Sequence, residues 1–123
     1  MLYAFLCYND EEIVGAWSKE YDDHIMARLE VVHGKLAAEG RLAGAARLLP
    51  TTAATSLRKA DEPAVLDGPF VETKEQLLGF YVIDCADLDQ ALATARDLAE
   101  ANPGAGGYEV RPVGLFVAGT GLS

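Results

Sequence analysis

The densest group of chemically capable side chains lies in residues 67–76 (DGPFVETKEQ), where three carboxylates and a lysine surround a Gly-Pro pair. A carboxylate beside a lysine can hold a polar group of a substrate, and it can act as a base where it is partly desolvated. One interpretation therefore places Asp67, Glu72 and Lys74 along a cleft, with Asp67 as the acid or base and the other two as orienting charges. In the alternative interpretation, Asp67 only accepts hydrogen bonds from the amides of the turn.

The same segment also has a structural explanation. Gly68 lies between an acidic residue and a proline, where a backbone conformation that other residues resist is expected. Phe70 is expected to anchor the loop in the core, and it is also a candidate ligand-binding residue. Thr73 and Gln76 have the spacing of a capping box, which predicts one or two helical turns over 73–78, ended by Gly79.

The two histidines lie on one predicted helix, residues 18–39. Nine residues separate His24 from His33, so they differ by about 180° around the helix axis and cannot hold one metal ion together. No metal and no cofactor are therefore expected. His33 is near the apolar stripe of this helix, where it either reaches a pocket as a proton carrier or bonds a backbone carbonyl. His24 is expected on an exposed charged face.

Few other residues suggest a particular chemistry. The glycine-rich stretch 104–107 follows a predicted helix and precedes a strand, the reverse of the order that phosphate binding requires. Arg111 is a candidate for binding a carboxylate, and an ion pair with a neighbouring acid is the alternative. Cys7 and Cys85 have no disulfide or metal spacing and are expected to be small buried hydrophobes.

The elements that must position these residues alternate along the chain. Strands are predicted at 2–8, 41–49, 80–84 and 108–113, helices at 18–39 and from Asp87 onward, and a hairpin at 55–67. This βαββαβ order with an extra hairpin predicts a ferredoxin-like α+β fold, in which an antiparallel sheet carries both helices on one face. A single domain is expected over 1–118, with a flexible tail at 119–123.

The second face of such a sheet needs a cover. Apolar side chains exceed what two helices can hide, and those assigned to this surplus are Tyr3, Phe5, Phe80, Val82, Phe116 and Val117. Packing of the sheet against that of a second copy would bury them, so a homodimer is predicted.

Composition excludes several classes of partner. The net charge is −9, with 19 acidic and 10 basic residues and no local basic cluster, which disfavours nucleic acids and anionic membrane surfaces. No apolar stretch approaches the roughly 20 residues that cross a bilayer. The first ten residues lack the features of a signal peptide, so a cytoplasmic protein is expected.

Residues 67–84 (DGPFVETKEQLLGFYVID), together with DLDQALATA and YEVRPV further on, resemble the DGPF-motif branch of the YCII-related family. The resemblance extends from the first strand to Val113. It implies a dimeric α+β barrel, in which the sheets of two ferredoxin-like subunits pack together.

For function, the resemblance implies two alternatives. YCII relatives resemble enzymes that use a His–Asp pair for proton transfer or elimination on small ring substrates, but the position of their histidine corresponds here to Leu29. A small-molecule enzyme or binding protein, with Asp67 and His33 as candidate catalytic residues, is the first alternative. The second is a non-catalytic accessory protein that acts through a protein partner such as an alternative sigma factor.

Overall fold

The computed structural model describes residues 1–119 and contains three α-helices and six strands in this range. The predicted tail, 119–123, lies outside the described residues except for Gly119. The elements follow the order β1 (Leu2–Asp10), α1 (Glu11–Gly15), α2 (Lys19–Ala38), β2 (Leu42–Arg47), a short 3-10 helix (Thr51–Ala53), β3 (Thr55–Arg58), β4 (Ala64–Asp67), β5 (Glu75–Asp84), α3 (Leu88–Ala101) and β6 (Gly107–Pro112).

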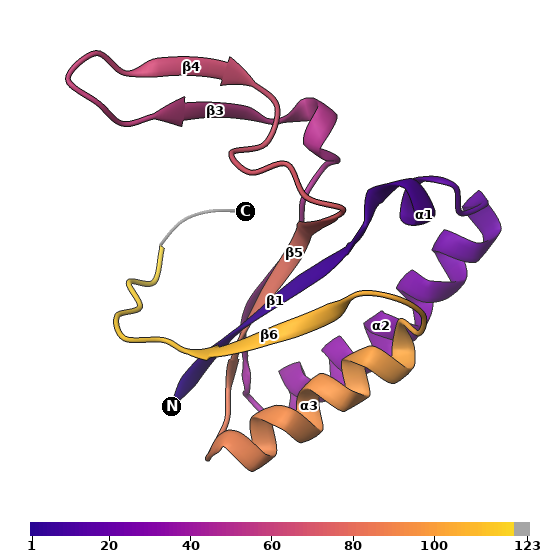
Figure 1. Cartoon of the computed structure of the whole chain (residues 1–123). Coiled ribbons are helices and arrows are strands. Elements are labelled where there is room, and N and C mark those ends of the chain that lie inside the picture. The colour runs from indigo at the N-terminus through magenta and orange to yellow at the C-terminus, as the bar shows by residue number, and fades with distance from the viewer. Residues whose placement is uncertain (120–123) are drawn as a thin grey trace.

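Four strands form one antiparallel sheet in the order β2-β5-β1-β6. Both long helices lie on the same face of this sheet (Figure 1). The predicted ferredoxin-like α+β fold is thereby confirmed. The core fills the space between the helices and the sheet, and its fully buried side chains include Phe5, Ile25, Ile83 and Leu98.

The sequence determines where α2 begins and ends. Ser18 accepts a hydrogen bond from the amide of Tyr21 at 3.1 Å, as an N-cap residue does, and Gly40 follows the helix with a φ of 68°. Ile25, Leu29 and Leu36 are buried. Their spacings of four and seven residues place them on one face of the helix, and this face packs on the sheet.

The prediction that Tyr3 and Phe5 belong to the uncovered face is wrong. Both are buried beneath the helices, since successive residues of β1 point to opposite sides of the sheet. Leu2, Ala4 and Leu6, between and beside them, are the residues that point the other way. Because the two sets are about equally apolar, the pattern of β1 alone does not say which of them faces the helices.

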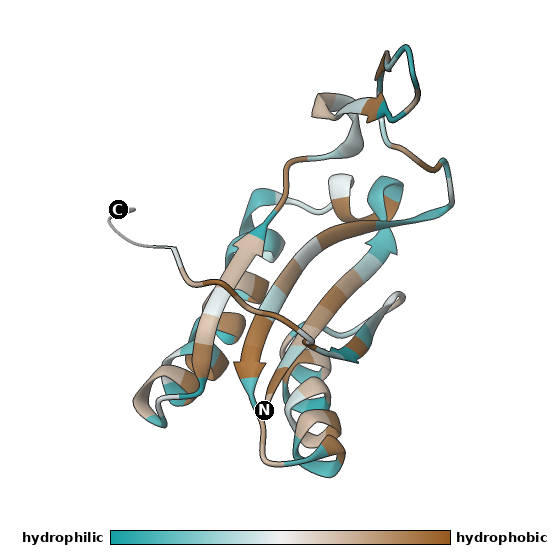
Figure 2. Ribbon diagram, turned by 90° about the vertical axis from the view of Figure 1, so that its left-hand side faces the viewer, coloured by the Kyte–Doolittle hydropathy of each residue, from teal (hydrophilic) through white to brown (hydrophobic). Residues whose placement is uncertain are grey.

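The face without helices is largely apolar. Figure 2 looks onto it: hydrophobic stretches follow the strands, and the chain after β6 crosses in front of them. The register places Ala4 beside Val82 and Leu6 beside Phe80 on this side. Phe80 is 36% exposed, and the apolar segment Leu115–Val117 is exposed as well. We call this surface the open face.

The β3–β4 hairpin was predicted, and it projects beyond the end of the sheet, away from both helices (Figure 1). Gly68 follows it with a φ of 103°, the conformation expected for this turn. Phe70 does not reach the core as predicted. It is 60% exposed and packs beneath the guanidinium of Arg58, 4.6 Å from the ring centroid.

The prediction of helical turns over 73–78 is also wrong, since β5 begins at Glu75 and extends the sheet. Gln76 turns back on the loop, but its amide nitrogen donates to the carbonyls of Val71 and Thr73 at 3.0 and 3.2 Å instead of capping a helix. Backbone pairing with Asn9 and Asp10 of β1 outweighs the local capping signal.

None of the helices described in residues 1–119 combines the length and apolar character needed to cross a membrane.

Candidate functional site

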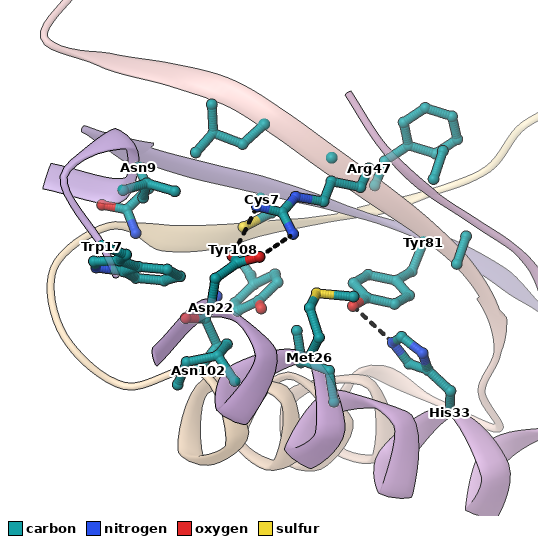
Figure 3. A pocket seen from close by; sticks show the side chains of 18 residues that line it. Cys7, Asn9, Trp17, Asp22, Met26, His33, Arg47, Tyr81, Asn102 and Tyr108 are labelled. Atoms are coloured by element: carbon teal, nitrogen blue, oxygen red, sulfur yellow. Dashed lines mark hydrogen bonds and ion pairs between the residues drawn. The ribbon is translucent and has the colours of Figure 1, made fainter. Parts of the chain in front are cut away.

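A cavity of about 260 Å³ lies between α2 and the sheet (Figure 3). Its wall is mostly apolar, and a few polar groups interrupt it. The lining residues come from β1, α1, the turn before α2, α2, β2, β5, the C-cap of α3 and β6: Cys7, Asn9, Val14, Trp17, Asp22, Ile25, Met26, Leu29, His33, Ala45, Ala46, Arg47, Leu78, Gly79, Phe80, Tyr81, Asn102 and Tyr108.

His33 and Tyr81 form a hydrogen-bonded pair on this wall. The imidazole Nε2 lies 2.9 Å from the Tyr81 hydroxyl, and the two rings are 5.3 Å apart between centroids. His33 comes from α2 and Tyr81 from β5, so the pair joins the helix to the sheet (Figure 3). Of the two predicted roles for His33, its location matches the one at a pocket wall, and its partner is a side chain instead of a backbone carbonyl.

Burial sets the protonation of this pair. It lowers the pKa of His33 below the usual 6.5, with Glu30 partly opposing the shift, so the imidazole is neutral at pH 7. Burial also raises the pKa of Tyr81 to about 12, which keeps the phenol protonated. A neutral imidazole next to a phenol can pass a proton in either direction, because each group can donate and accept.

A second polar group, formed by Cys7, Tyr108 and Asn102, lies elsewhere on the wall. Cys7 and Tyr108 are opposite each other in the register of β1 and β6, and Asn102 follows α3 as its C-cap. Burial raises the pKa of both Cys7 and Tyr108, so both stay protonated at neutral pH. A protonated thiol is a weak nucleophile, and Cys7 therefore acts here as a polar part of the wall.

An ion pair lies at the edge of the cavity. The guanidinium of Arg47 on β2 meets the Asp22 carboxylate on α2 with two contacts, at 2.9 and 3.4 Å (Figure 3). The pair spans from helix to sheet, and both side chains retain contact with solvent. Among the residues of 1–119 that line the cavity, these are the only two of the types Asp, Glu, Lys and Arg, and their charges cancel.

The residues of the Asp67–Gln76 segment lie apart from this cavity. Asp67 is exposed, pairs with Thr55 through the backbone of the hairpin, and lines neither the cavity nor the hollow described next. Glu72 and Lys74 line an open hollow that also includes Glu11, whose carboxylate accepts a hydrogen bond from the Thr51 amide at 2.7 Å. The structure thus brings Glu72 and Lys74 together, but without Asp67 or His33.

The remaining two candidates lie in other places. Arg111 is on β6, paired in register with Ala4, and its guanidinium donates to the Glu109 carboxylate, as in the ion-pair alternative. Phe70 is exposed beneath Arg58. Within residues 1–119, no three His, Cys, Asp or Glu side chains are grouped so that they could hold a metal ion.

Sequence reasoning did not identify Tyr81, Asn102 and Tyr108 as site residues. Tyr81 is 48 residues from His33, and the two meet only because the register of β5 brings this side chain beneath α2. A signal was present, since an aromatic hydroxyl occupies a core-facing position of a predicted buried strand. A buried tyrosine usually needs a hydrogen-bond partner.

Comparison with known proteins gives a consistent result. The YCII-related domain matches residues 1–117 of this chain. An uncharacterized protein from Rhizobium meliloti (strain 1021) is 60% identical over 120 residues, which cover 97% of each chain. The chain therefore belongs to the YCII-related family.

Proposed function

We propose that this protein binds a small, largely apolar molecule in the cavity beneath α2 and exchanges a proton with it through Tyr81 and His33. The observation that carries the proposal is the 2.9 Å contact between these two side chains on the cavity wall. Their positions suit a site that shields a ligand, since the wall is mostly apolar with a few convergent polar groups.

The pair can work as a relay. When the Tyr81 hydroxyl donates a hydrogen bond to the neutral Nε2 of His33, its oxygen can accept a hydrogen bond from an acidic X–H group of the ligand. Movement of that proton to Tyr81, with the tyrosine proton passing to His33, leaves an anion on X and an imidazolium on His33. Glu30, one turn before His33 on α2, favours that imidazolium electrostatically.

The family resemblance points to the same wall of the cavity as the place where the ligand binds. The position that corresponds to the histidine of the better understood YCII relatives is Leu29, which is buried and lines the cavity. His33 lies one helical turn further along α2 and lines it too. In this proposal, His33 takes the role of that histidine, and Tyr81 takes the place of its acidic partner.

Binding can be tested with 4-ethylphenol, measured by titration calorimetry. An engineered cavity of about 150 Å³ holds benzene, so a substituted phenol suits the larger volume here. Met26→Trp would fill the cavity and is expected to weaken binding at least tenfold. Val31→Trp is the matched control, because Val31 is on the same helix but 74% exposed. No binding, or equal loss in both variants, would contradict the proposal.

The relay predicts a further pattern among the variants. His33→Gln and Tyr81→Phe should each weaken 4-ethylphenol binding, because each removes one member of the hydrogen-bonded chain. His24→Gln is the control, since His24 is exposed on the same helix and does not line the cavity. Equal affinity in all three variants would leave a binding cavity without the proposed relay.

We also propose a homodimer formed through the open face. Its support is the apolar surface around Leu6 and Phe80, which the helices do not cover. Phe80→Asp should convert a dimer into a monomer in native mass spectrometry, whereas Asp97→Asn, on exposed α3, should not. A wild-type monomer at micromolar concentration would contradict this.

A second candidate function, the accessory protein, is favoured by the hairpin. The hairpin and the loop that follows it expose several large apolar side chains, namely Leu57, Val65, Leu66, Phe70 and Val71. A protein partner such as a sigma factor would bind there. Purified partner and protein should then associate, and Val65→Asp with Leu66→Asp should abolish the association while 4-ethylphenol binding is retained.

A further inference from the structure

The β3–β4 hairpin stands apart from the main sheet. It forms a two-stranded sheet of its own, and every residue in its strands except Ser56 is exposed. Its base is fixed, because the Gly68 amide donates to the Ala54 carbonyl at 2.7 Å and the Ser56 hydroxyl donates to the Gly68 carbonyl at 2.8 Å. An isolated two-stranded hairpin is at best marginally stable in water, so this hairpin is expected to pack on a further surface.

The two sides of the hairpin differ in what covers them. On one side, Arg58 lies over the Phe70 ring, so the loop after β4 folds back against the hairpin there. On the other side, Leu57 and Val65 are directly opposite each other in the register and are 57% and 67% exposed. Opposed apolar side chains on paired strands form one continuous surface. We call these two side chains the hairpin patch.

The hairpin projects on the side of the open face. In Figure 1, the hairpin and the chain after β6 both extend to the left, away from the helices. Figure 2 is seen from that left-hand side and looks onto the open face, so the hairpin points outward from this face. Strands of four residues with their turn reach about 15 Å, further than the roughly 10 Å between two stacked sheets. A second sheet stacked on the open face therefore lies within reach of the hairpin.

The open face alone falls short of the area of a stable interface. Its four strands of six to ten residues cover roughly 500 Å², whereas a stable dimer takes about 800 Å² from each copy. Part of this area is charged, since Glu109 and Arg111 are paired in register with Leu6 and Ala4 and lie on the same side. Further apolar area must come from elements beside the face, and the hairpin patch supplies it.

We infer that each hairpin of the homodimer packs Leu57 and Val65 against the partner copy. This inference rests on the proposed homodimer and extends its interface from the open face to the hairpin. A twofold dimer buries the same surface on both copies, so both hairpins are covered together. The second candidate function needs a free hairpin and does not apply to such a dimer.

Sedimentation equilibrium of the whole chain tests this inference through the dimer dissociation constant. Leu57→Ser combined with Val65→Ser should weaken dimerisation about a hundredfold or more, because the symmetric interface loses two apolar side chains from each copy. Val31→Ser is the matched control, since Val31 is 74% exposed but lies on α2, and it should leave the constant within twofold. An unchanged constant in the hairpin variant would overturn the inference.

Hydrogen–deuterium exchange of the wild-type protein gives a second test that needs no variant. Exchange is compared at protein concentrations well above and well below the dissociation constant. Amides of residues 55–67 should exchange several-fold more slowly in the dimer, because packing against the partner suppresses local opening of the hairpin. Amides of α3, on the helix side of the sheet, are the internal control and should not change. Equal exchange of residues 55–67 at both concentrations would overturn the inference.

The remaining outcomes separate this inference from the homodimer on which it rests. If Phe80→Asp dissociates the dimer but the hairpin variant does not, the open face alone forms the interface. The inference then fails while the homodimer stands, and the hairpin is left to a different protein. If the wild-type protein is a monomer at micromolar concentration, both fail. Ligand binding in the cavity is independent of these results, since neither Leu57 nor Val65 lines it.

Discussion

The cavity beneath α2 and the segment Asp67–Gln76 differ in what surrounds their polar groups. In the cavity, His33 and Tyr81 meet at 2.9 Å on an apolar wall, and burial shifts the pKa of both. In the segment, Asp67 is exposed, and Glu72 and Lys74 line an open hollow. The segment contains more ionisable groups within ten residues, but water surrounds them.

This difference shows why residue types alone are a weak guide to a site. A charged group in water keeps its ordinary protonation and gains little from a neighbour, whereas a group in a partly closed cavity has a shifted pKa and a fixed orientation. The conspicuous segment of this protein contains a turn, with Gly68 at a φ of 103°. The residues suited to proton transfer are separated by 48 positions in the sequence.

The largest difference between the two regions should appear when a methyl group is added to a glycine in each. A Cβ at Gly79, beside the cavity, would lie 2.6 Å from the Ala46 carbonyl oxygen, so β2 and β5 must separate. Gly79→Ala should destabilise the fold by about 2–4 kcal/mol, as strained core substitutions do. Gly68→Ala meets no neighbouring atom and should cost about 1–2 kcal/mol from its positive φ alone.

Urea unfolding measures both effects, and Gly34→Ala provides the control. Gly34 lies within α2 with no atom near its added Cβ, so alanine there should stabilise by up to about 1 kcal/mol. A cost at Gly68 that equals or exceeds that at Gly79 would mean that the turn, and not the strand pair beside the cavity, is the more constrained region.

The next largest difference between the cavity and the segment is expected in an alkaline titration of Tyr81. The pKa of Tyr81 is raised to about 12 in the fold against the usual 10, so its contribution to stability is complete below pH 10 and is lost as the pH rises toward 12. In ultraviolet absorbance titrations, Tyr81→Phe should remove part of the late phenolate signal. A late signal that stays unchanged would place Tyr81 in contact with solvent.

A smaller effect is expected on the acid side, from His33. Its pKa is lowered in the fold, so below pH 6.5 the unfolded state binds more protons and stability falls toward the lowered pKa. His33→Gln should flatten this slope, and His24→Gln should not. Nuclear magnetic resonance of the two imidazoles gives each pKa directly, and a His33 pKa above 6.5 would count against a neutral base.

The smallest effect is expected in the segment itself. Asp67→Asn removes a charge that is exposed and outside the cavity, so the free energy of unfolding should change by less than about 0.5 kcal/mol. Affinity for 4-ethylphenol should stay within twofold of wild type. A larger loss of affinity would bring Asp67 back as a ligand-binding residue.

Much of the fold could be predicted from local patterns. The stripe of Ile25, Leu29 and Leu36, the cap at Ser18 and the order of elements all follow from spacing and residue type. The predictions failed where long-range pairing decides. Thr73 and Gln76 have a helical capping pattern, but the chain pairs with β1 from Glu75 onward. The face of β1 that packs on the helices depends on the whole sheet.

The site was only partly predictable for the same reason. His33 could be placed near a pocket because its position on the helix follows from counting residues. Its partner Tyr81 and the neighbouring wall residue Asn102 could not be placed there. The position of Tyr81 depends on strand register, and that of Asn102 depends on where α3 ends. The face of a helix on which a residue lies can be deduced from a sequence, but contacts between β5 and α2 require the folded structure.

Amide chemical-shift mapping with 4-ethylphenol tests most directly the claim that the ligand site is the cavity and not the conspicuous loop. We expect saturable shifts at His33, Gly79, Tyr81 and Tyr108, which disappear in Met26→Trp and persist in Val31→Trp. Shifts concentrated at Gly68–Gln76, with none around the cavity, would contradict it.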